Sequence, residues 1–508
     1  MSETAIHDYL RTHAAEETDP AFLAYLANLS VIAQTAPEVA GAIVQELEDQ
    51  RHYLKLIASE NYCSPATQLA MGNLLTDKYA EGVPFQRFYE GCDNVDTVEA
   101  MARDEACKLF GAEHAYVQPH SGADANMVAF WAILTARVEV PGLEKFNTTN
   151  PMTLSQEDWN SIREGLNNQR LLGMDYYSGG HLTHGYRRNL SAKMFDAYSY
   201  AVNRETGLLD YDEIEAMALD LRPLILLAGY SAYPRRVNFR RMREIADKAG
   251  AVLMVDMAHF AGLVAGGVFE GDENPIPHAQ VVTSTTHKTL RGPRGGFVLC
   301  TKEFADYVDK GCPLVIGGPL PHMLAAKAVA FHEANRPDFR DYAQKIVENS
   351  RSLAEALKEQ DFVLATGGTD NHLMLINVAE SCGLTGAQAA SAVRDCGITL
   401  NFNSLPFDPN GPLITSGLRV GTAAATTLGM GGNEMKEIAA IIGLVLRNTK
   451  AALLTSGENA GKPSKRQFVL DDKTRQEAQA RVRTLLDQFP VYPELDLETL
   501  KSCFSRTR

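Results

Sequence analysis

The sequence predicts an α/β protein with a mostly parallel sheet flanked by helices, followed by a smaller α+β region. Apolar runs of strand length recur in the middle of the chain, and segments with helical spacing, such as 240–250, separate them. Strands that alternate with helices form mostly parallel sheets, because each helical crossover covers a face of the sheet. The apolar runs are 224–233, 251–262, 281–286 and 295–301.

Three of these runs end in polar residues. They finish in Ser231, Asp256 and Thr285. Because ligands of parallel α/β sheets bind beyond the carboxyl ends of the strands, we expect these three side chains at one binding edge.

The first part of the chain is predicted to be an arm followed by helices. Residues 1–24 are polar and mixed in charge. Residues 31–56 have helical spacing, with a capping-type start near Thr35 to Glu38.

The spacing from about 96 to 135 is again helical. Gly111 interrupts it, and so does the segment 114–126, which has the pattern of a strand, a turn and a helix. The following residues, 137–168, are rich in Pro, Asn, Thr and Glu, and we interpret them as a surface insertion with a short helix at 155–166.

The last third begins with a helical pattern at 342–360 and continues as mixed helix and strand. Residues 452–468 are rich in Gly, Ser and Lys and are predicted to be a loose loop. The predicted parts are an N-terminal arm with helices (1–75), a large cofactor-binding domain (76–336) and a small C-terminal domain (337–508).

Composition excludes several classes of partner. The 508 residues carry a formal net charge of -15, which disfavours binding to nucleic acid or to an anionic membrane. The eight cysteines form no CxxC pair, the N-terminus has no apolar core flanked by basic residues, and no run of about 18 apolar residues occurs. We therefore expect a cytoplasmic protein without a zinc knuckle, a redox dithiol or a membrane span.

Lys288 stands out in the segment 286–296, THKTLRGPRGG. It follows an apolar strand and precedes a turn rich in Gly and Arg, so it could form a Schiff base. Taken alone, a lysine in such a place is usually an ordinary surface residue. A phosphate-binding GxxxxGKS loop is excluded, because that order of residues is missing.

Asp256 and the pair Ser121–Gly122 strengthen the case for a pyridinium cofactor. A carboxylate beside the ring nitrogen keeps that nitrogen protonated, and Asp256 ends a strand about 30 residues before Lys288. Ser121 and Gly122 stand at a helix start, where backbone amides and the helix dipole suit a phosphate group. Each feature also has a plain alternative: a capping or metal-binding Asp, and a simple Ser N-cap.

At these residues the chain resembles the serine hydroxymethyltransferase family, within the aspartate aminotransferase-like fold of pyridoxal-phosphate enzymes. Most of the chain is covered in unbroken order, and the strings around Ser59 and Lys288 are distinctive of the family. The matching strings are LIASENYCSP, KYAEG, GCDNVD, VQPHSG, GGHLTHG, SAYPR, DMAHFAGLVAGG, THKTLRGPRGG and ITSGLRVGT. The resemblance implies a seven-stranded-type sheet, transfer of a one-carbon unit between serine and tetrahydrofolate, and a homodimer or dimer of dimers with shared active sites.

The resemblance also implies roles for individual residues. Lys288 would bind pyridoxal phosphate covalently, Asp256 would pair with the ring nitrogen, and His181 would stack on the ring. Other cofactor contacts would come from Ser121, Gly122, Ser231, His259, Thr285 and His287 of one subunit and from Gly317 and Gly318 of the other.

Substrate and folate contacts are implied in the same way. Arg419, helped by Ser59, would hold the substrate carboxylate through a two-pronged pair. Tyr79, Glu81 and Tyr89 would come from the neighbouring subunit, with Glu81 transferring protons at the serine hydroxyl and the folate. The folate pterin would contact Gly180, Leu182 and Asn403.

A metal site is not expected. His181 and His184 have a spacing that could hold a metal, but the adjacent glycines and the lack of a third ligand in the sequence disfavour it. We interpret them as a stacking residue and a structural hydrogen-bond partner.

Several positions depart from the usual family pattern. Asp124 places a negative charge near the expected phosphate, and Ala123 removes a potential donor. The other departures are Phe88, Glu90, Ser178 and Arg291. Phe88 and Ser178 keep a second interpretation open, a folate-independent pyridoxal-phosphate aldolase or amino-acid racemase. A third, a non-catalytic scaffold, would require the loss of Lys288, Asp256 or Arg419, and all three are present.

Overall fold

The computed structural model describes residues 5–14, 18–457 and 459–504. Parts of the predicted arm, residues 1–4 and 15–17, lie outside the described residues. No helix in these ranges is long and apolar enough to cross a membrane.

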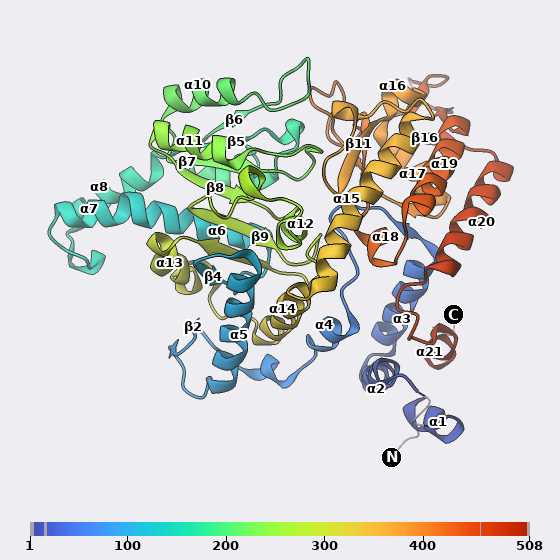
Figure 1. Ribbon diagram of the computed structural model, residues 1–508, viewed down its shortest axis with the longest axis horizontal. Helices are drawn as coiled ribbons and strands as arrows, with labels where there is room; N and C mark the ends of the chain where they lie inside the picture. Colours follow the sequence, from blue (N-terminus) through green and yellow to red (C-terminus); the bar gives the residue numbers. More distant parts are fainter. Residues whose placement is uncertain (1–4, 15–17, 458, 505–508) are drawn as a thin grey trace.

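A seven-stranded sheet forms the centre of the larger body, at the left of Figure 1. Its strand order is β4-β10-β9-β8-β7-β5-β6. The run from β9 to β6 is parallel, whereas β10 is antiparallel to both β9 and β4. The predicted α/β class with a mostly parallel sheet is therefore confirmed. The strands are β4 (His114–Tyr116), β5 (Arg170–Met174), β6 (Asp196–Tyr200), β7 (Ile225–Gly229), β8 (Val252–Asp256), β9 (Val281–Thr285) and β10 (Gly296–Cys300).

Helices cover both faces of this sheet, so its central strands are apolar throughout. Successive residues of a strand point to opposite faces. In β7, Leu226 and Ala228 pack into one hydrophobic cluster, while Ile225 and Leu227 pack into another. The helices of the first cluster include α5 (Asp93–Phe110), α10 (Tyr211–Leu221), α11 (Phe239–Ala249), α12 (Ala261–Ala265) and α14 (Pro321–Ala334), and those of the second include α6 (Gly122–Leu134) and α13 (Lys302–Asp309).

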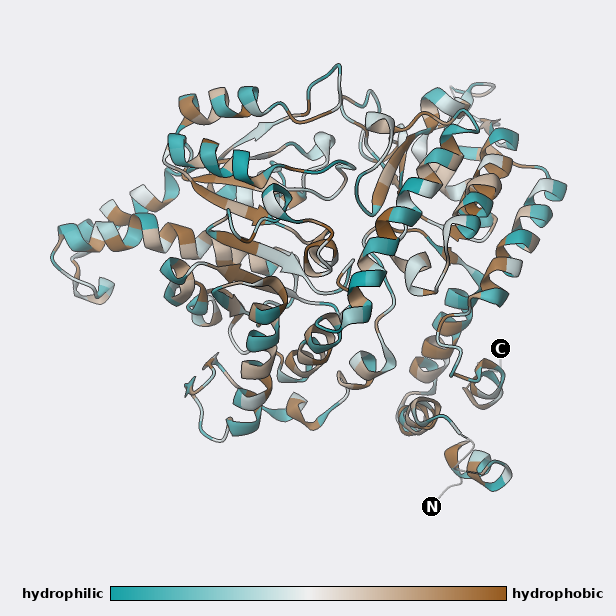
Figure 2. Ribbon diagram, in the orientation of Figure 1, coloured by the Kyte–Doolittle hydropathy of each residue, from teal (hydrophilic) through white to brown (hydrophobic). Residues whose placement is uncertain are grey.

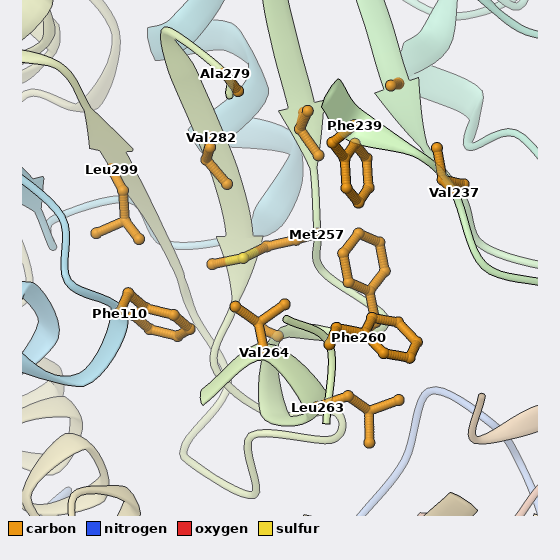
Figure 3. Packing of buried hydrophobic residues seen from close by; sticks show 14 of the residues in the cluster. Phe110, Val237, Phe239, Met257, Phe260, Leu263, Val264, Ala279, Val282 and Leu299 are labelled. Atoms are coloured by element: carbon orange, nitrogen blue, oxygen red, sulfur yellow. The ribbon is translucent and has the colours of Figure 1, made fainter. Parts of the chain in front are cut away.

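The first cluster has an aromatic centre beside β8. Phe260 stacks on Phe239 with ring centroids 5.8 Å apart and on Tyr230 at 4.9 Å. Figure 3 shows Phe239, Met257 and Phe260 packed together at the end of the sheet. Met257 lies two residues before His259 and Phe260 directly follows it, so this packing holds the backbone on both sides of His259.

A long helix, α15 (Pro337–Lys358), joins the larger body to the C-terminal part (Figure 1). Its first half packs in the first cluster through Phe339 and Ile346, and its second half packs in a separate cluster through Leu353 and Leu357. Figure 2 shows hydrophilic and hydrophobic residues alternating along α15, as expected for a helix with one apolar face. The other elements of that part are β11 (Leu373–Asn377), β12 (Ile398–Thr399), β13 (Asn401–Asn403), β14 (Gly417–Gly421), α16 (Val378–Cys382), α17 (Gly386–Asp395), α18 (Ala423–Thr427), α19 (Gly432–Asn448) and α20 (Asp472–Gln488).

One local prediction was wrong in part. Both ends of the segment 452–468, predicted to be a loose loop, belong to an antiparallel pair formed by β15 (Lys450–Leu453) and β16 (Pro463–Val469), whereas residues 454–457 and 459–462 lie outside the strands. Gln388 of α17 holds this pair by donating to the carbonyls of Ser464 and Gln467, a tertiary contact that composition does not reveal.

The prediction for the N-terminal helices was right in part. A helix, α3 (Pro37–His52), begins within the predicted start at Thr35 to Glu38, although Ala36 before it provides no side-chain cap. Another helix, α2 (Pro20–Thr35), already begins after the N-cap Asp19, so the helical part of the chain starts before residue 31. Both helices pack against α21 (Leu497–Phe504) near the end of the chain, and α1 (Ala5–Thr12) packs beside α2. The strand β1 (Leu54–Lys55) pairs with β12. The division at residues 75 and 336 stays a prediction, supported by the separation of the clusters on either side of α15.

The insertion 137–168 contains the predicted short helix, α8 (Gln156–Asn167). At the start of the insertion, the chain continues from α6 through a π-helical turn, η3 (Thr135–Glu139), into α7 (Val140–Lys145). Figure 1 shows α7 and α8 projecting from the larger body on the side away from the C-terminal part.

Candidate active site

A cavity of about 450 Å³ lies at the carboxyl edge of the parallel strands. It brings together residues that are up to 360 positions apart in the chain, from Ser59 to Arg419. Its lining consists of Ser59, Glu60, Ser121, Gly122, Ala123, His181, Ser231, Asp256, Ala258, His259, Thr285, His287, Lys288, Arg294 and Arg419.

The sheet positions the lining as the sequence predicted. Asp256 and Thr285 are the last residues of β8 and β9, and Ser231 lies two residues beyond β7. Because these strands are adjacent and parallel, the three side chains meet at one edge. Lys288 enters the same cavity from the turn after β9.

The amine of Lys288 lies in a nearly desolvated, positively charged setting. Burial lowers its pKa to about 8; Asp256 opposes this, whereas Arg419 and Arg294 add to it. A lysine with a lowered pKa holds a larger share of the neutral amine near neutral pH. Lys288 is therefore a candidate nucleophile towards a carbonyl group.

Asp256 is a buried carboxylate that accepts three hydrogen bonds. The donors are Nδ2 of Asn126 at 2.9 Å, Nε2 of His184 at 3.2 Å and the backbone N–H of Ala258 at 3.0 Å. Burial alone would raise the pKa of Asp256, but the hydrogen bonds and charges of His184, His181 and Asn126 outweigh it and hold that pKa below its ordinary value. The group therefore stays ionised, as a partner for a protonated ring nitrogen must.

A buried chain of polar side chains links this carboxylate to His181. Asn126 donates to Oγ1 of Thr183 at 2.7 Å, and Nδ1 of His181 lies 2.7 Å from that hydroxyl and accepts from the backbone N–H of Thr183 at 3.2 Å. Thr283 donates to Oδ1 of Asn126 at 2.5 Å. Asn126, Thr183 and Thr283 were not predicted as site residues, although Asn126 ends the segment 114–126 that was predicted to form a strand, a turn and a helix.

The sequence also missed a third group that could complete a metal site. The ligand atoms of His181, His184 and Asp256 all lie within 4.8 Å of one another, so a third ligand is present in space. A carboxylate oxygen of Asp256 accepts a hydrogen bond from His184, so the closeness of these two side chains needs no metal ion. The interpretation of His184 as a structural hydrogen-bond partner agrees with this contact.

The start of α6 forms the opposite wall of the cavity. Ser121 caps the helix by accepting from the backbone N–H of Asp124 at 3.1 Å. A Cβ atom on Gly122 would lie only 2.7 Å from Cγ2 of Thr285, so the backbone here approaches the strand end closely. Nearby, Nδ1 of His287 is buried and has no hydrogen-bond partner in the part of the chain that the structure describes. Burial lowers the pKa of His287 to about 3, with Lys288 and Arg294 adding to the effect. Backbone N–H groups and Arg294 suit an anion such as phosphate.

Arg419 stands between this cavity and a second one of about 200 Å³. Its Nε donates to Oδ1 of Asn401 at 3.1 Å and its Nη1 to the carbonyl of Ser231 at 2.8 Å. Burial lowers its pKa to about 10, and it remains a cation that can pair with a carboxylate. The second cavity is lined by Tyr176, Gly180, His181, Ser231, Ala232, Asn401, Phe402, Asn403, Ser404, Pro412, Thr415 and Arg419.

The residues implied for folate binding are only partly brought together. Gly180 and Asn403 line the second cavity, but Leu182 does not and is 41% exposed.

Besides Leu182, five predicted residues do not line either cavity. They form a separate group on the surface, which we call the loop group: Tyr79, Glu81, Tyr89, Gly317 and Gly318. The rings of Tyr79 and Tyr89 lie 5.0 Å apart, and a Cβ atom on Gly318 would lie 2.8 Å from the Tyr79 ring. Cys312 joins the two loops: the backbone N–H of Gly82 donates to its sulfur at 3.1 Å, and its thiol donates to the carbonyl of Gly317 at 3.2 Å.

Comparison with known proteins assigns a family to this architecture. The family model described as serine hydroxymethyltransferase matches residues 32–150 and 157–442. This chain belongs to the serine hydroxymethyltransferase family. Proteins named serine hydroxymethyltransferase are similar over nearly the whole chain: one from Treponema pallidum is 60% identical (100% of this chain, 87% of the relative), and one from Cutibacterium acnes is 54% identical (98% and 100%). A third, from Mycolicibacterium smegmatis, is 56% identical (96% and 97%).

The departures from the usual serine hydroxymethyltransferase pattern fall in different surroundings. Ser178 is buried and accepts from the backbone N–H of Val202 at 3.2 Å, so it supports the backbone outside the cavity lining. The guanidinium of Arg291 lies 4.4 Å from the centre of the Tyr342 ring. Phe88, Glu90 and Ala123 are exposed, and Ala123 alone of these lines the cavity.

Two histidines whose pKa values are lowered by burial predict a loss of stability in acid. Burial lowers the pKa of His372 to about 3, and that of His181 to about 4. In the unfolded chain each titrates near 6.5, so below pH 6.5 the unfolded state binds protons that the folded state excludes. We expect the free energy of unfolding to fall between pH 6.5 and pH 4, by about 1.4 kcal/mol per pH unit for each such histidine.

Urea unfolding at a series of pH values measures this slope. His372→Gln should flatten it, and His52→Gln, at an exposed position, is the control. A slope that is the same in His372→Gln and in the wild type would contradict the prediction.

Proposed function

We propose that the cavity around Lys288 catalyses the reversible conversion of L-serine and tetrahydrofolate to glycine and 5,10-methylenetetrahydrofolate, with pyridoxal phosphate as cofactor. The observation that carries the proposal is the meeting of a desolvated amine (Lys288), an ionised buried carboxylate (Asp256) and a guanidinium (Arg419) in one cavity. Family membership supports the same reaction.

The residues present fit pyridoxal phosphate. Lys288 would hold its aldehyde, Asp256 its ring nitrogen and His181 one ring face, while Ser231, His259 and Thr285 would surround the remaining ring substituents. The N-terminus of α6 at Ser121 and Gly122, together with His287, would hold the phosphate. When bound, the cofactor supplies a carbonyl that condenses with amines and a ring that accepts electrons.

Within this arrangement, the chain's own groups orient the substrate and handle protons. Arg419, helped by Ser59, would bind the serine carboxylate and so fix the orientation of the substrate's alpha carbon in the cavity. Asp256 remains ionised and balances positive charge at the ring nitrogen. The second cavity, which shares Arg419 with the first, would hold tetrahydrofolate beside Gly180 and Asn403.

We further propose a homodimer, or a dimer of dimers, in which the loop group completes the site of the neighbouring subunit. Tyr79 is 56% exposed, Tyr89 48% and Phe88 70%, and large apolar side chains in such numbers on one loop favour a protein contact. Tyr79, Glu81 and Tyr89 would then contact serine and folate, and Gly317 and Gly318 the phosphate.

Mixing two inactive variants tests the shared site. A Lys288→Ala subunit combined with a Glu81→Gln subunit should form one intact site per mixed dimer, and random reassembly should restore about one quarter of wild-type activity. Activity is measured after the subunits are mixed in denaturant and refolded, with each variant refolded alone as the control. No recovery would place Glu81 and Lys288 in the same subunit's site.

The variant Glu81→Gln should separate the folate-dependent reaction from the folate-independent reactions of the same site. Because the carboxylate would transfer protons at the serine hydroxyl and the folate, its loss should lower folate-dependent serine cleavage by about 10²- to 10⁴-fold. Folate-independent cleavage of a bulky β-hydroxy amino acid should change much less. Equal loss of both activities would favour the alternative, a folate-independent aldolase or racemase.

The defining experiment measures glycine formation from serine by the purified protein with pyridoxal phosphate, in the presence and absence of tetrahydrofolate. Folate-dependent glycine formation is expected. Folate-independent turnover alone would support the alternative function, which the Phe88 and Ser178 departures keep open.

A cytoplasmic location also remains a proposal. The eight cysteines support it, because all eight are free thiols and reduced thiols persist in a reducing compartment. The insertion 137–168 could act as a shield at the folate entrance or as an extended oligomer contact. None of its residues lines either cavity, which favours the oligomer contact. Deletion of the insertion with no change in assembly state or folate affinity would refute both.

A further inference from the structure

His259 and His372 form a buried pair of imidazoles behind the cavity. His259 follows β8 and lines the cavity, whereas His372 immediately precedes β11 in the C-terminal part. Nδ1 of His259 lies 3.1 Å from Nε2 of His372, and the ring centroids are 5.3 Å apart. Both residues are buried, with 2% and 0% of their surface exposed.

The backbone holds His372 in place for this contact. Its carbonyl accepts from the backbone N–H of Thr422 at 3.0 Å. The preceding residue, Asn371, donates to the hydroxyl of Tyr230 at 3.1 Å and to the carbonyl of Tyr233 at 3.0 Å, both in the larger body. The imidazole therefore reaches across from one part of the molecule to the other in a fixed position.

Both rings are neutral, so a single proton lies between them. Burial lowers the pKa of His259 well below its usual value and that of His372 to about 3, and the charges of Lys288 and Arg419 add to both shifts. The shared proton is carried either by Nε2 of His372 or by Nδ1 of His259. A neutral imidazole has one nitrogen that donates and one that accepts. In each ring, the nitrogen outside the shared hydrogen bond therefore donates if the other accepts, and accepts if the other donates.

The surroundings of His372 distinguish the two cases. Its Nδ1 is buried and has no hydrogen-bond partner among the described residues. If His259 donated, that Nδ1 would carry a buried N–H without an acceptor, and orphaned buried donors are rarer than unsatisfied acceptors. If His372 donates from Nε2, its Nδ1 carries only a lone pair.

We propose that His372 is a positioning residue that donates to His259 and thereby makes His259 a hydrogen-bond donor towards the cavity through Nε2–H. An oxygen of the bound cofactor or substrate that carries negative charge would accept this bond. Only the identity of the acceptor, an oxygen of the cofactor or substrate, rests on the proposed function. The positions of the protons on His259 and His372 do not depend on it.

Neutron diffraction from crystals of the purified holoenzyme, after exchange into heavy water, tests the assignment directly. Deuterium is expected on Nε2 of His372 and on Nε2 of His259. Deuterium on Nδ1 of His372 would overturn the proposal. The expected pattern in a protein that fails to cleave serine would overturn the proposed function and leave this assignment in place.

Kinetics of two variants give a second measurement. His372→Leu removes the donor and should lower kcat for serine by about 10- to 100-fold, the range for groups that orient a functional side chain, with a smaller change in KM. His372→Gln keeps an amide N–H to donate to His259 and should recover most of that loss, and His52→Leu is the exposed control. Wild-type kcat in His372→Leu would overturn the positioning role; if that variant does not fold, the neutron result decides.

Discussion

Replacing Lys288 with alanine is expected to lower steady-state turnover of serine by roughly 10³-fold or more, the scale of losses when the nucleophile of a cooperating set is removed. The physical reason is that the neutral amine of Lys288 would both bind the cofactor carbonyl and displace the product amine, and no other lysine among the described residues lines the cavity. The visible absorbance of a lysine-bound cofactor should disappear from the purified variant, while the far-ultraviolet circular dichroism stays that of a folded protein.

The control for Lys288→Ala is Lys193→Ala, which changes an exposed lysine on the short helix α9 (Ser191–Met194). It should keep both the absorbance and the turnover of the wild type. Turnover of Lys288→Ala within tenfold of the wild type would mean that another group binds the cofactor, and it would remove the central residue from the proposal.

The largest expected effect on stability is that of Arg87→Met. Arg87 is buried and connects the loop that carries Glu81 to α5. Its Nη2 donates to Glu99 at 2.7 Å and its Nε to Asp96 at 2.8 Å. Its Nη1 donates to the carbonyls of Ala80 and Gly82, each at 2.9 Å. Burial raises the pKa of Glu99, and the adjacent guanidinium opposes that rise.

Removing Arg87 leaves Glu99 buried without its cation, and this should lower the free energy of unfolding by about 3–5 kcal/mol. Gln118, which donates to the other oxygen of Glu99 at 2.8 Å, cannot supply a charge. Denaturant unfolding measures the change. Lys345→Met, which breaks an exposed pair with Glu348, should cost about 0–1 kcal/mol and serves as the control.

The double variant Arg87→Met, Glu99→Leu separates the cost of the unpaired charge from the loss of packing. It should be more stable than Arg87→Met alone, because no isolated buried charge from Glu99 remains. Equal stability of the single and double variants would show that Glu99 does not need its partner. In Arg87→Met, folate-dependent activity should also fall, since the backbone on both sides of Glu81 loses its support.

The sequence by itself determined the fold class and the centre of the candidate site. Apolar strand runs alternate with helices, and parallel strands end at one edge, so Ser231, Asp256 and Thr285 had to approach each other once the sheet was predicted. Lys288 could be added because it lies three residues beyond Thr285 on the same segment. The short helix 155–166 was likewise predictable, because its capping Ser155 and helical spacing are local.

Only the tertiary structure decided how these groups are supported. Asn126, His184 and His372 make hydrogen bonds to partners 72 to 130 positions away, and no local pattern encodes such pairings. The strands at 450–453 and 463–469 form for the same reason, since α17 holds one of them in place. The structure also separated the loop group from the cavity within one chain, because the distance between two loops depends on the packing of the whole domain and not on the residues of either loop.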